Sequence, residues 1–215
     1  WDMRVKPPRV AKGVKLDFSG FTGPMITEGN YTIKLVKGDQ SIEQKVEIKN
    51  DPTSYYSIEE RKLQQQTSAE IFKLQEDLAY LAAKLNAIKD QGASRKNGNA
   101  ANKALGGMVD GLLKKVDVLY VTLVASIEWT NITGEEKLRE KISDVYYGVI
   151  SYEGKPTQSQ LDRIKGLQKE FQDAVTAGEK IFNLDLKALN AYLVKAKLDE
   201  VKLPSREDWD KETLK

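Results

Sequence analysis

The clearest hydrophobic pattern in the chain lies between residues 57 and 90. Leucine and isoleucine recur there at steps of four and three, which places them on one stripe of an α-helix. The stripe consists of Leu74, Leu78, Leu81, Leu85 and Ile88. Ser57 and Glu60 stand three positions apart at the start and can form a capping box. At about 1.5 Å per residue the helix is roughly 50 Å long, which indicates an elongated bundle.

Three more helices are predicted after a polar turn over residues 91–102. The second, over residues 103–129, is apolar almost all round, so we expect it to be the most buried. The third begins with a capping box at residues 133–136. The fourth begins at Thr157 and is ended by Pro204. Its apolar spacing contains an extra step of four, which predicts local unwinding or a bend near residues 181–186.

Residues 1–53 follow a different pattern, in which apolar and polar residues alternate as in β-strands. They predict a hairpin whose turn contains Gly38 and whose apolar face holds Tyr31, Ile33, Leu35, Ile42, Val46 and Ile48. A lone hairpin is marginally stable, so further strands are expected over residues 2–5 and 15–18, or from chain that precedes residue 1. Tyr31 is placed either as the tyrosine corner of an immunoglobulin-like sandwich or as an ordinary half-buried strand residue.

The predicted fold class is therefore α+β, mainly α. We expect a partial Ig-like β segment over residues 1–53, an elongated antiparallel four-helix bundle over residues 54–203 and a tail over residues 204–215. The boundary is set at Asn50-Asp51-Pro52-Thr53, where the strand pattern breaks. Trp209 in the tail is expected to dock back on the bundle or on the β segment.

Composition narrows the possible functions. The 215 residues carry a net charge of +2, and residues 1–53 hold 9 basic against 7 acidic side chains, so a nucleic-acid partner is disfavoured. The chain has no histidine and no cysteine, so catalysis would rest on carboxylates, Lys, Tyr or Ser. Neither a metal site nor a cofactor motif is predicted. The longest apolar run, residues 116–127, is too short to span a membrane and contains Asp117.

Two constellations could carry chemistry. Adjacent carboxylates, such as Glu135 with Glu136, point about 100° apart on a helix and form no convergent acid–base pair by themselves. Aromatic residues around the second and third helices could form a sugar-stacking platform, although core or rim packing is the simpler interpretation. They are Trp129, Tyr146, Tyr147 and Tyr152.

Several short sequence segments together resemble the end of the Ig-like segment that follows the β-propeller in large bacterial sortilin-like, BNR-repeat proteins described as glycosyl hydrolases. They are Trp1-Asp2-Met3-Arg4, Gly23-Pro24-Met25, Gly29-Asn30-Tyr31-Thr32-Ile33-Lys34-Leu35 and Asn50-Asp51-Pro52. Short segments of the predicted bundle resemble the helical C-terminal part of the same proteins. They are Tyr147-Gly148-Val149-Ile150, Gly154-Lys155-Pro156-Thr157-Gln158 and Leu186-Lys187-Ala188-Leu189-Asn190.

This resemblance implies that the chain is part of a longer polypeptide exported from the cytoplasm, with any glycosidase residues in an upstream propeller. It transfers no catalytic residue to this sequence. We expect a non-catalytic C-terminal structural or interaction module, monomeric, which contacts the propeller and a polysaccharide or protein partner. Two alternatives stay open: a carbohydrate-active enzyme with carboxylates in a groove between β segment and bundle, and an oligomeric helical adaptor.

Overall fold

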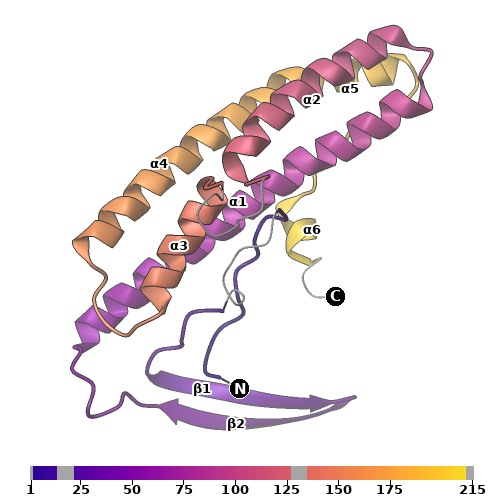
Figure 1. Ribbon diagram of the computed structural model, residues 1–215. Coiled ribbons are helices and arrows are strands. Elements are labelled where there is room, and N and C mark those ends of the chain that lie inside the picture. The colour runs from indigo at the N-terminus through magenta and orange to yellow at the C-terminus, as the bar shows by residue number, and fades with distance from the viewer. Residues whose placement is uncertain (1, 14–21, 127–134, 212–215) are drawn as a thin grey trace.

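A computed structural model describes residues 2–13, 22–126 and 135–211. The molecule is elongated, with long helices running side by side and a β-hairpin beside one end (Figure 1). The elements are β1 (Gly29–Lys37), β2 (Gln40–Ile48), α1 (Ile58–Gly98), α2 (Lys103–Leu123), α3 (Leu138–Ile150), α4 (Gln158–Lys180), the π-helical segment η1 (Ile181–Leu186), α5 (Lys187–Lys195) and α6 (Arg206–Lys211). The fold is thus mainly helical with one small sheet.

Helix α1 confirms the predicted start and stripe. The Ser57 side chain accepts a hydrogen bond from the Glu60 amide, and the Glu60 carboxylate accepts one from the Ser57 amide, so the capping box is present. All five predicted stripe residues are buried. The expected turn over residues 91–102 is wrong in its first part, because α1 continues to Gly98. Gly92 packs against α2, and the Gln91 amide group bonds the backbone of Lys202 twice, so tertiary contacts keep these residues helical.

A cross-section through either half of the bundle cuts three helices, which differs from the expected four-helix arrangement. Helices α2 and α3 lie one after the other along α1 (Figure 1). Lys89 pairs with Asp117 of α2 on one half of α1, and Gln75 donates to Ser143 of α3 on the other. The continuous helix formed by α4, η1 and α5 packs against both α2 and α3. Sequence stripes show which faces are buried, but they do not show which length of partner covers them.

Helix α2 is shorter and less buried than predicted. Its main stripe is buried as expected, but Val118 is 64% exposed and Val121 46% exposed, so it is not the all-round buried helix. It ends at Leu123 rather than at residue 129. Val124 takes an extended conformation and is buried beside Gly13, so the chain leaves the helix to fill the core. Helix α3 begins at Leu138, later than the box at residues 133–136, whose first two residues lie outside the described ranges.

The continuous helix formed by α4, η1 and α5, which we call the return helix, confirms the predicted irregularity. The apolar step from Ile181 to Leu186 spans five residues, and both side chains are buried. An α-helix would place residues five apart about 140° apart, whereas the wider π-helix keeps them near one face. Pro204 does not end this helix. It ends at Lys195, because Lys197 adopts a left-handed φ of 57° and the Leu198 amide donates to the Leu193 carbonyl, as in a Schellman motif.

Both ends of the chain dock on α1. Trp209 in α6 is buried, as expected, with its ring centroid 5.5 Å from that of Tyr80. The guanidinium carbon of Arg9 lies 3.5 Å from the centroid of the Trp209 ring, and that of Arg206 lies 4.9 Å from the same centroid. The N-terminal segment also reaches α3, since Arg139 donates to the Ala11 carbonyl at 2.9 Å. Residues before the hairpin therefore pack on the helices.

The hairpin forms with the predicted turn and face. Gly38, with a φ of +58°, takes the first central position of the turn, where a type II′ turn requires a positive φ. The sheet has two strands, so the described residues show no sandwich. Residues 2–5 contribute an isolated bridge between Arg4 and Met25, and residues 15–18 lie outside the described ranges. The apolar face is open: Leu35 is 68% and Ile42 71% exposed.

The π-helical segment generates a deletion test. Removing Leu184, which is exposed, turns the five-residue step into a four-residue step and lets the segment continue as an α-helix with its core face in phase. We expect this deletion to cost less than about 1.5 kcal/mol of unfolding free energy. Deleting the exposed Lys169 of α4 rotates one part of the stripe by about 100° and should cost more than about 3 kcal/mol. Denaturant unfolding of both variants gives the comparison, and equal costs would show that η1 does not set the register.

Candidate functional site

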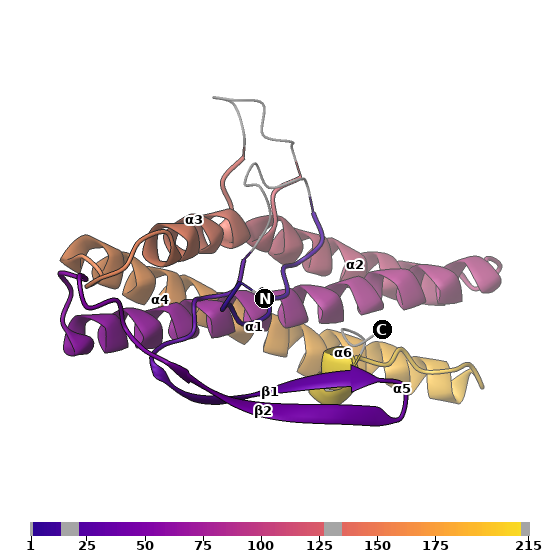
Figure 2. The same cartoon turned by 90° about the horizontal axis from the view of Figure 1, so that it is seen from below.

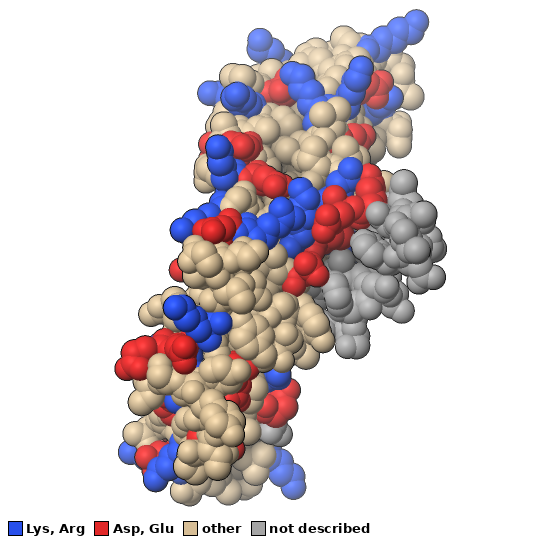
Figure 3. Space-filling model, turned by 60° about the vertical axis from the view of Figure 1, so that its left-hand side comes forward, with Lys and Arg blue, Asp and Glu red and all other residues tan. Residues whose placement is uncertain are grey.

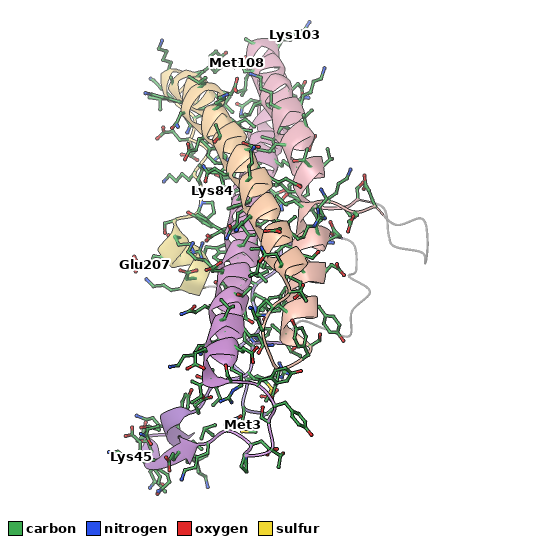
Figure 4. The ribbon with its side chains drawn as sticks, turned by 90° about the vertical axis from the view of Figure 1, so that its left-hand side faces the viewer. Met3, Lys45, Lys84, Lys103, Met108 and Glu207 are labelled. Carbon is green, nitrogen blue, oxygen red and sulfur yellow. The ribbon has the colours of Figure 1, made fainter. Side chains whose placement is uncertain are left out.

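The best candidate site is a cleft where the β segment meets the bundle, which we call the junction cleft. Its volume is about 440 Å³. Four parts of the chain line it: Met3 and Arg4 with residues 24–28, the end of β2 with residues 48–51, the first turns of α1, and the α3–α4 turn. Figure 4 shows Met3 and Lys45 at this end of the molecule and Lys103 and Met108 at the other.

Arg61 organises the cleft from the second turn of α1. Its Nη2 donates to Glu28 Oε1 at 2.8 Å, and its Nη1 donates to Asn50 Oδ1. The side chain is 11% exposed and that of Glu28 is 30% exposed, so the ion pair is largely screened from water. Glu28 precedes β1 and Asn50 follows β2. One guanidinium therefore holds both ends of the hairpin against the bundle.

Gln64, one helical turn further along α1, fastens the opposite wall. Its amide nitrogen donates to the Val149 carbonyl at 2.8 Å and to the Tyr152 carbonyl. Its amide oxygen accepts from the Gly154 backbone amide at 3.4 Å. Gly154 has a φ of +131°, and a Cβ there would lie 2.5 Å from the Tyr56 ring, so the turn requires glycine. The end of α3 is thus bonded to α1 through a single side chain.

The cleft contains carboxylates, as the groove alternative requires, but two of them already have partners. Glu28 is paired with Arg61. The Asp51 carboxylate accepts from the hydroxyl and amide of Thr53, and these hydrogen bonds lower its pKa. A glycosidase general acid needs a raised pKa, so Asp51 is unsuited to that role. Glu153 lines the cleft as well.

The predicted aromatic residues are placed differently from one another. Tyr146 is buried, its hydroxyl donates to the Thr22 carbonyl at 2.8 Å, and burial raises its pKa. Tyr147 is half exposed, and Trp129 lies outside the described residues. Tyr152 lines the junction cleft, with its hydroxyl 3.1 Å from both the Lys155 carbonyl and Gln160 Oε1. Tyr146 acts as a packing residue, and a ligand platform made by the four residues stays a prediction.

Sequence reasoning missed Arg61 and Gln64, although one signal was available. The polar run Gln64-Gln65-Gln66-Thr67-Ser68 precedes the apolar stripe of α1 in a helix that is otherwise expected to be covered. In the structure Thr67 and Ser68 are buried, with their hydroxyls bonded to carbonyls of α1 itself. A buried polar run on an otherwise apolar face indicates specific hydrogen bonding. The partners at the end of α3, in the α3–α4 turn and beside the hairpin are 11 to 90 residues away and leave no local trace.

No family model, curated protein or solved structure matches the chain. Within the described residues, acidic side chains do not gather into a metal-binding group. None of the helices there is long and apolar enough to cross a membrane. On the face drawn in Figure 3, basic and acidic side chains are interspersed. The geometry of the junction cleft therefore carries the functional argument.

Removing the Arg61 side chain tests whether the cleft is a structural joint. Arg61→Ala leaves Glu28 and Asn50 without their partner, so we expect a loss of about 2 kcal/mol in the free energy of unfolding. The matched control is Lys34→Ala, which breaks the exposed pair with Glu43 and should cost less than about 0.5 kcal/mol. Urea unfolding measures both, and an Arg61→Ala variant as stable as the control would contradict the joint.

Proposed function

We propose that the chain is a non-catalytic structural and interaction module from the C-terminal part of a larger exported β-propeller protein. The observation that carries the proposal is the internal pairing in the junction cleft. Arg61 is committed to Glu28 and Asn50, and Gln64 to the α3–α4 turn. Side chains committed in this way brace two parts of a molecule, whereas a reactive centre needs groups that are free to meet substrate.

The hairpin supports an Ig-like origin for the β segment. The Tyr31 hydroxyl donates to the Thr27 carbonyl at 2.8 Å, and a bond from the hydroxyl to upstream backbone is what a tyrosine corner requires. In such a sandwich β1 and β2 are the last two strands, and their open apolar face packs on strands from earlier in the polypeptide. The exposure of Ile33, Leu35 and Ile42 fits a face made for such a cover.

The bundle supplies a rigid arm for this module. Helix α1 extends for about 60 Å, and its stripe is covered by other helices of the same chain. In this proposal the arm holds the upstream propeller at a set distance from a protein or polysaccharide partner. Export from the cytoplasm belongs to the same proposal and rests on the resemblance of short sequence segments to the sortilin-like, BNR-repeat proteins.

One observation favours a second candidate, the carbohydrate-active enzyme. The junction cleft lies between the β segment and the bundle, where that hypothesis puts its carboxylates, and Glu28, Asp51 and Glu153 line it. Glycosidases of either stereochemistry need two convergent carboxyl groups. Hydrolysis of an aryl glycoside by the isolated chain, lost in Glu153→Gln and kept in Glu207→Gln on the remote α6, would favour this candidate over the module.

Truncation of the natural polypeptide tests the module directly. We expect the sequence upstream of residue 1 to encode a β-propeller. Removing residues 1–215 should then leave the kcat of that propeller unchanged within about twofold, because the deleted part makes no contact with the reacting bond. Activity assays and thermal unfolding of both forms give the measurement, with a lower Tm expected for the truncated form. An upstream region without a propeller, or a kcat that falls a hundredfold, would refute the proposal.

A further inference from the structure

Strand β2 has an open edge on the outside of the molecule. In two perpendicular views β2 lies beyond β1 from the helices, so β1 covers one edge and nothing described covers the other (Figures 1 and 2). Residues 40–45 are all exposed. An exposed edge strand carries unpaired N–H and C=O groups and is a template for another strand.

The hairpin register shows which backbone groups face this edge. The two-residue turn is closed by Lys37 and Gln40, so this pair is hydrogen-bonded, and hydrogen-bonded pairs then alternate along the ladder. Gln40, Ile42, Gln44 and Val46 bond to β1 in this phase. The alternate residues Ser41, Glu43, Lys45 and Glu47 therefore direct their backbone N–H and C=O groups outward.

The side chains of β2 are self-complementary about Gln44. In an antiparallel pair of two copies with a two-fold axis at Gln44, Glu43 lies opposite Lys45 of the second copy. Ile42 lies opposite Val46 of the second copy on the apolar face. The pairs that this register makes hydrogen-bonded, Glu43 with Lys45 and Ser41 with Glu47, are those with outward backbone groups.

Several other pairings are worse. Centring the axis on Lys45 puts Glu43 opposite Glu47, and like charges directly opposite destabilise a sheet. Parallel pairing in register stacks Glu43 on Glu43. The edge of β1, centred on Ile33, places Thr32 opposite Lys34 and offers no opposite charges. Edge lysines usually oppose pairing, but in the register centred on Gln44 Lys45 lies opposite the carboxylate of Glu43. A register centred on Val46 would also place Lys45 opposite a carboxylate, that of Glu47, but it moves the pairing away from the fully exposed residues 40–45 towards Val46 and Ile48, which are partly buried.

We propose that a second copy of this chain pairs with the open edge of β2 in antiparallel register about Gln44. The product is a four-stranded sheet in the order β1–β2–β2–β1, with two-fold symmetry. Its one face joins the apolar faces of both hairpins around the two Gln44 side chains at the axis, and its other face carries the Lys34–Glu43 pair of each copy, 3.1 Å between charged atoms. The helices take no part in this dimer, so the apolar stripes of the bundle stay buried within each copy.

A cysteine at the two-fold axis tests the register. The chain has no cysteine, so Gln44→Cys introduces a single thiol. At a non-hydrogen-bonded antiparallel pair the Cα atoms lie about 4.5 Å apart, within disulfide range. The matched control is Ile33→Cys, opposite Gln44 on the same face of β1. We expect Gln44→Cys to form the covalent dimer at least tenfold faster on mild oxidation of the full chain, and equal rates would overturn the proposal.

Charge reversal tests the chemistry of the interface. Sedimentation of the wild-type chain over a hundredfold concentration range should show a monomer–dimer equilibrium. Glu43→Lys faces Lys45 of the second copy and should weaken the dimer at least tenfold, while Glu43→Lys with Lys45→Glu restores it. Lys34→Ala removes the partner of Glu43 within the hairpin and should leave the dimer intact. A wild-type chain that stays monomeric throughout would overturn the proposal.

Amide hydrogen exchange gives a readout that needs no variant. The amides of Glu43 and Lys45 point outward and should exchange more slowly as wild-type concentration rises, because each becomes bonded to the second copy. The amides of Ile42 and Gln44, already bonded to β1, should change little. Exchange at Glu43 and Lys45 that is independent of concentration would overturn the pairing.

Discussion

The structure depends on covering the apolar stripe of α1. This helix has 41 residues, whereas α2 has 21 and α3 has 13, so neither partner alone can bury the stripe. The two short helices lie in tandem instead, and one long return helix spans both. A helix that must stay in contact over that length drifts out of phase with its stripe, and η1 corrects the phase between Ile181 and Leu186.

The same constraint explains where polar groups are buried. Beyond the part of α1 that lies against α2, its surface faces α3 and the N-terminal segment, and there hydrogen bonds join the parts. Arg61, Gln64 and Gln75 each reach a partner on another element. The hairpin is attached through this joint and keeps its apolar face and the β2 edge open. In the proposed module, the bundle is the arm and the open sheet at its end is the part left available for interaction.

The sequence predicts what is local and periodic. The stripes, the Ser57 capping box, the hairpin turn and the irregularity before Leu186 follow from spacing alone. Positions where tertiary contacts override local preference were predicted wrongly. Gly92 suggested a turn, yet it lies in α1 against Val109 of α2, and α2 ends early because Val124 enters the core. The tandem order of α2 and α3 and the Arg61 joint depend on long-range contacts that no local pattern encodes.

Native-state hydrogen exchange along α1 tests most directly whether tandem covering makes one cooperative unit. Because the return helix spans both α2 and α3, amides near Ile71, under α3, and near Ile88, under α2, should exchange only through global unfolding. Their opening free energies should then be equal, and equal to the unfolding free energy from denaturant titration. If the Ile71 region opens with a clearly lower free energy while the Ile88 region stays protected, the two halves of the bundle unfold as separate units, which would contradict a single cooperative unit.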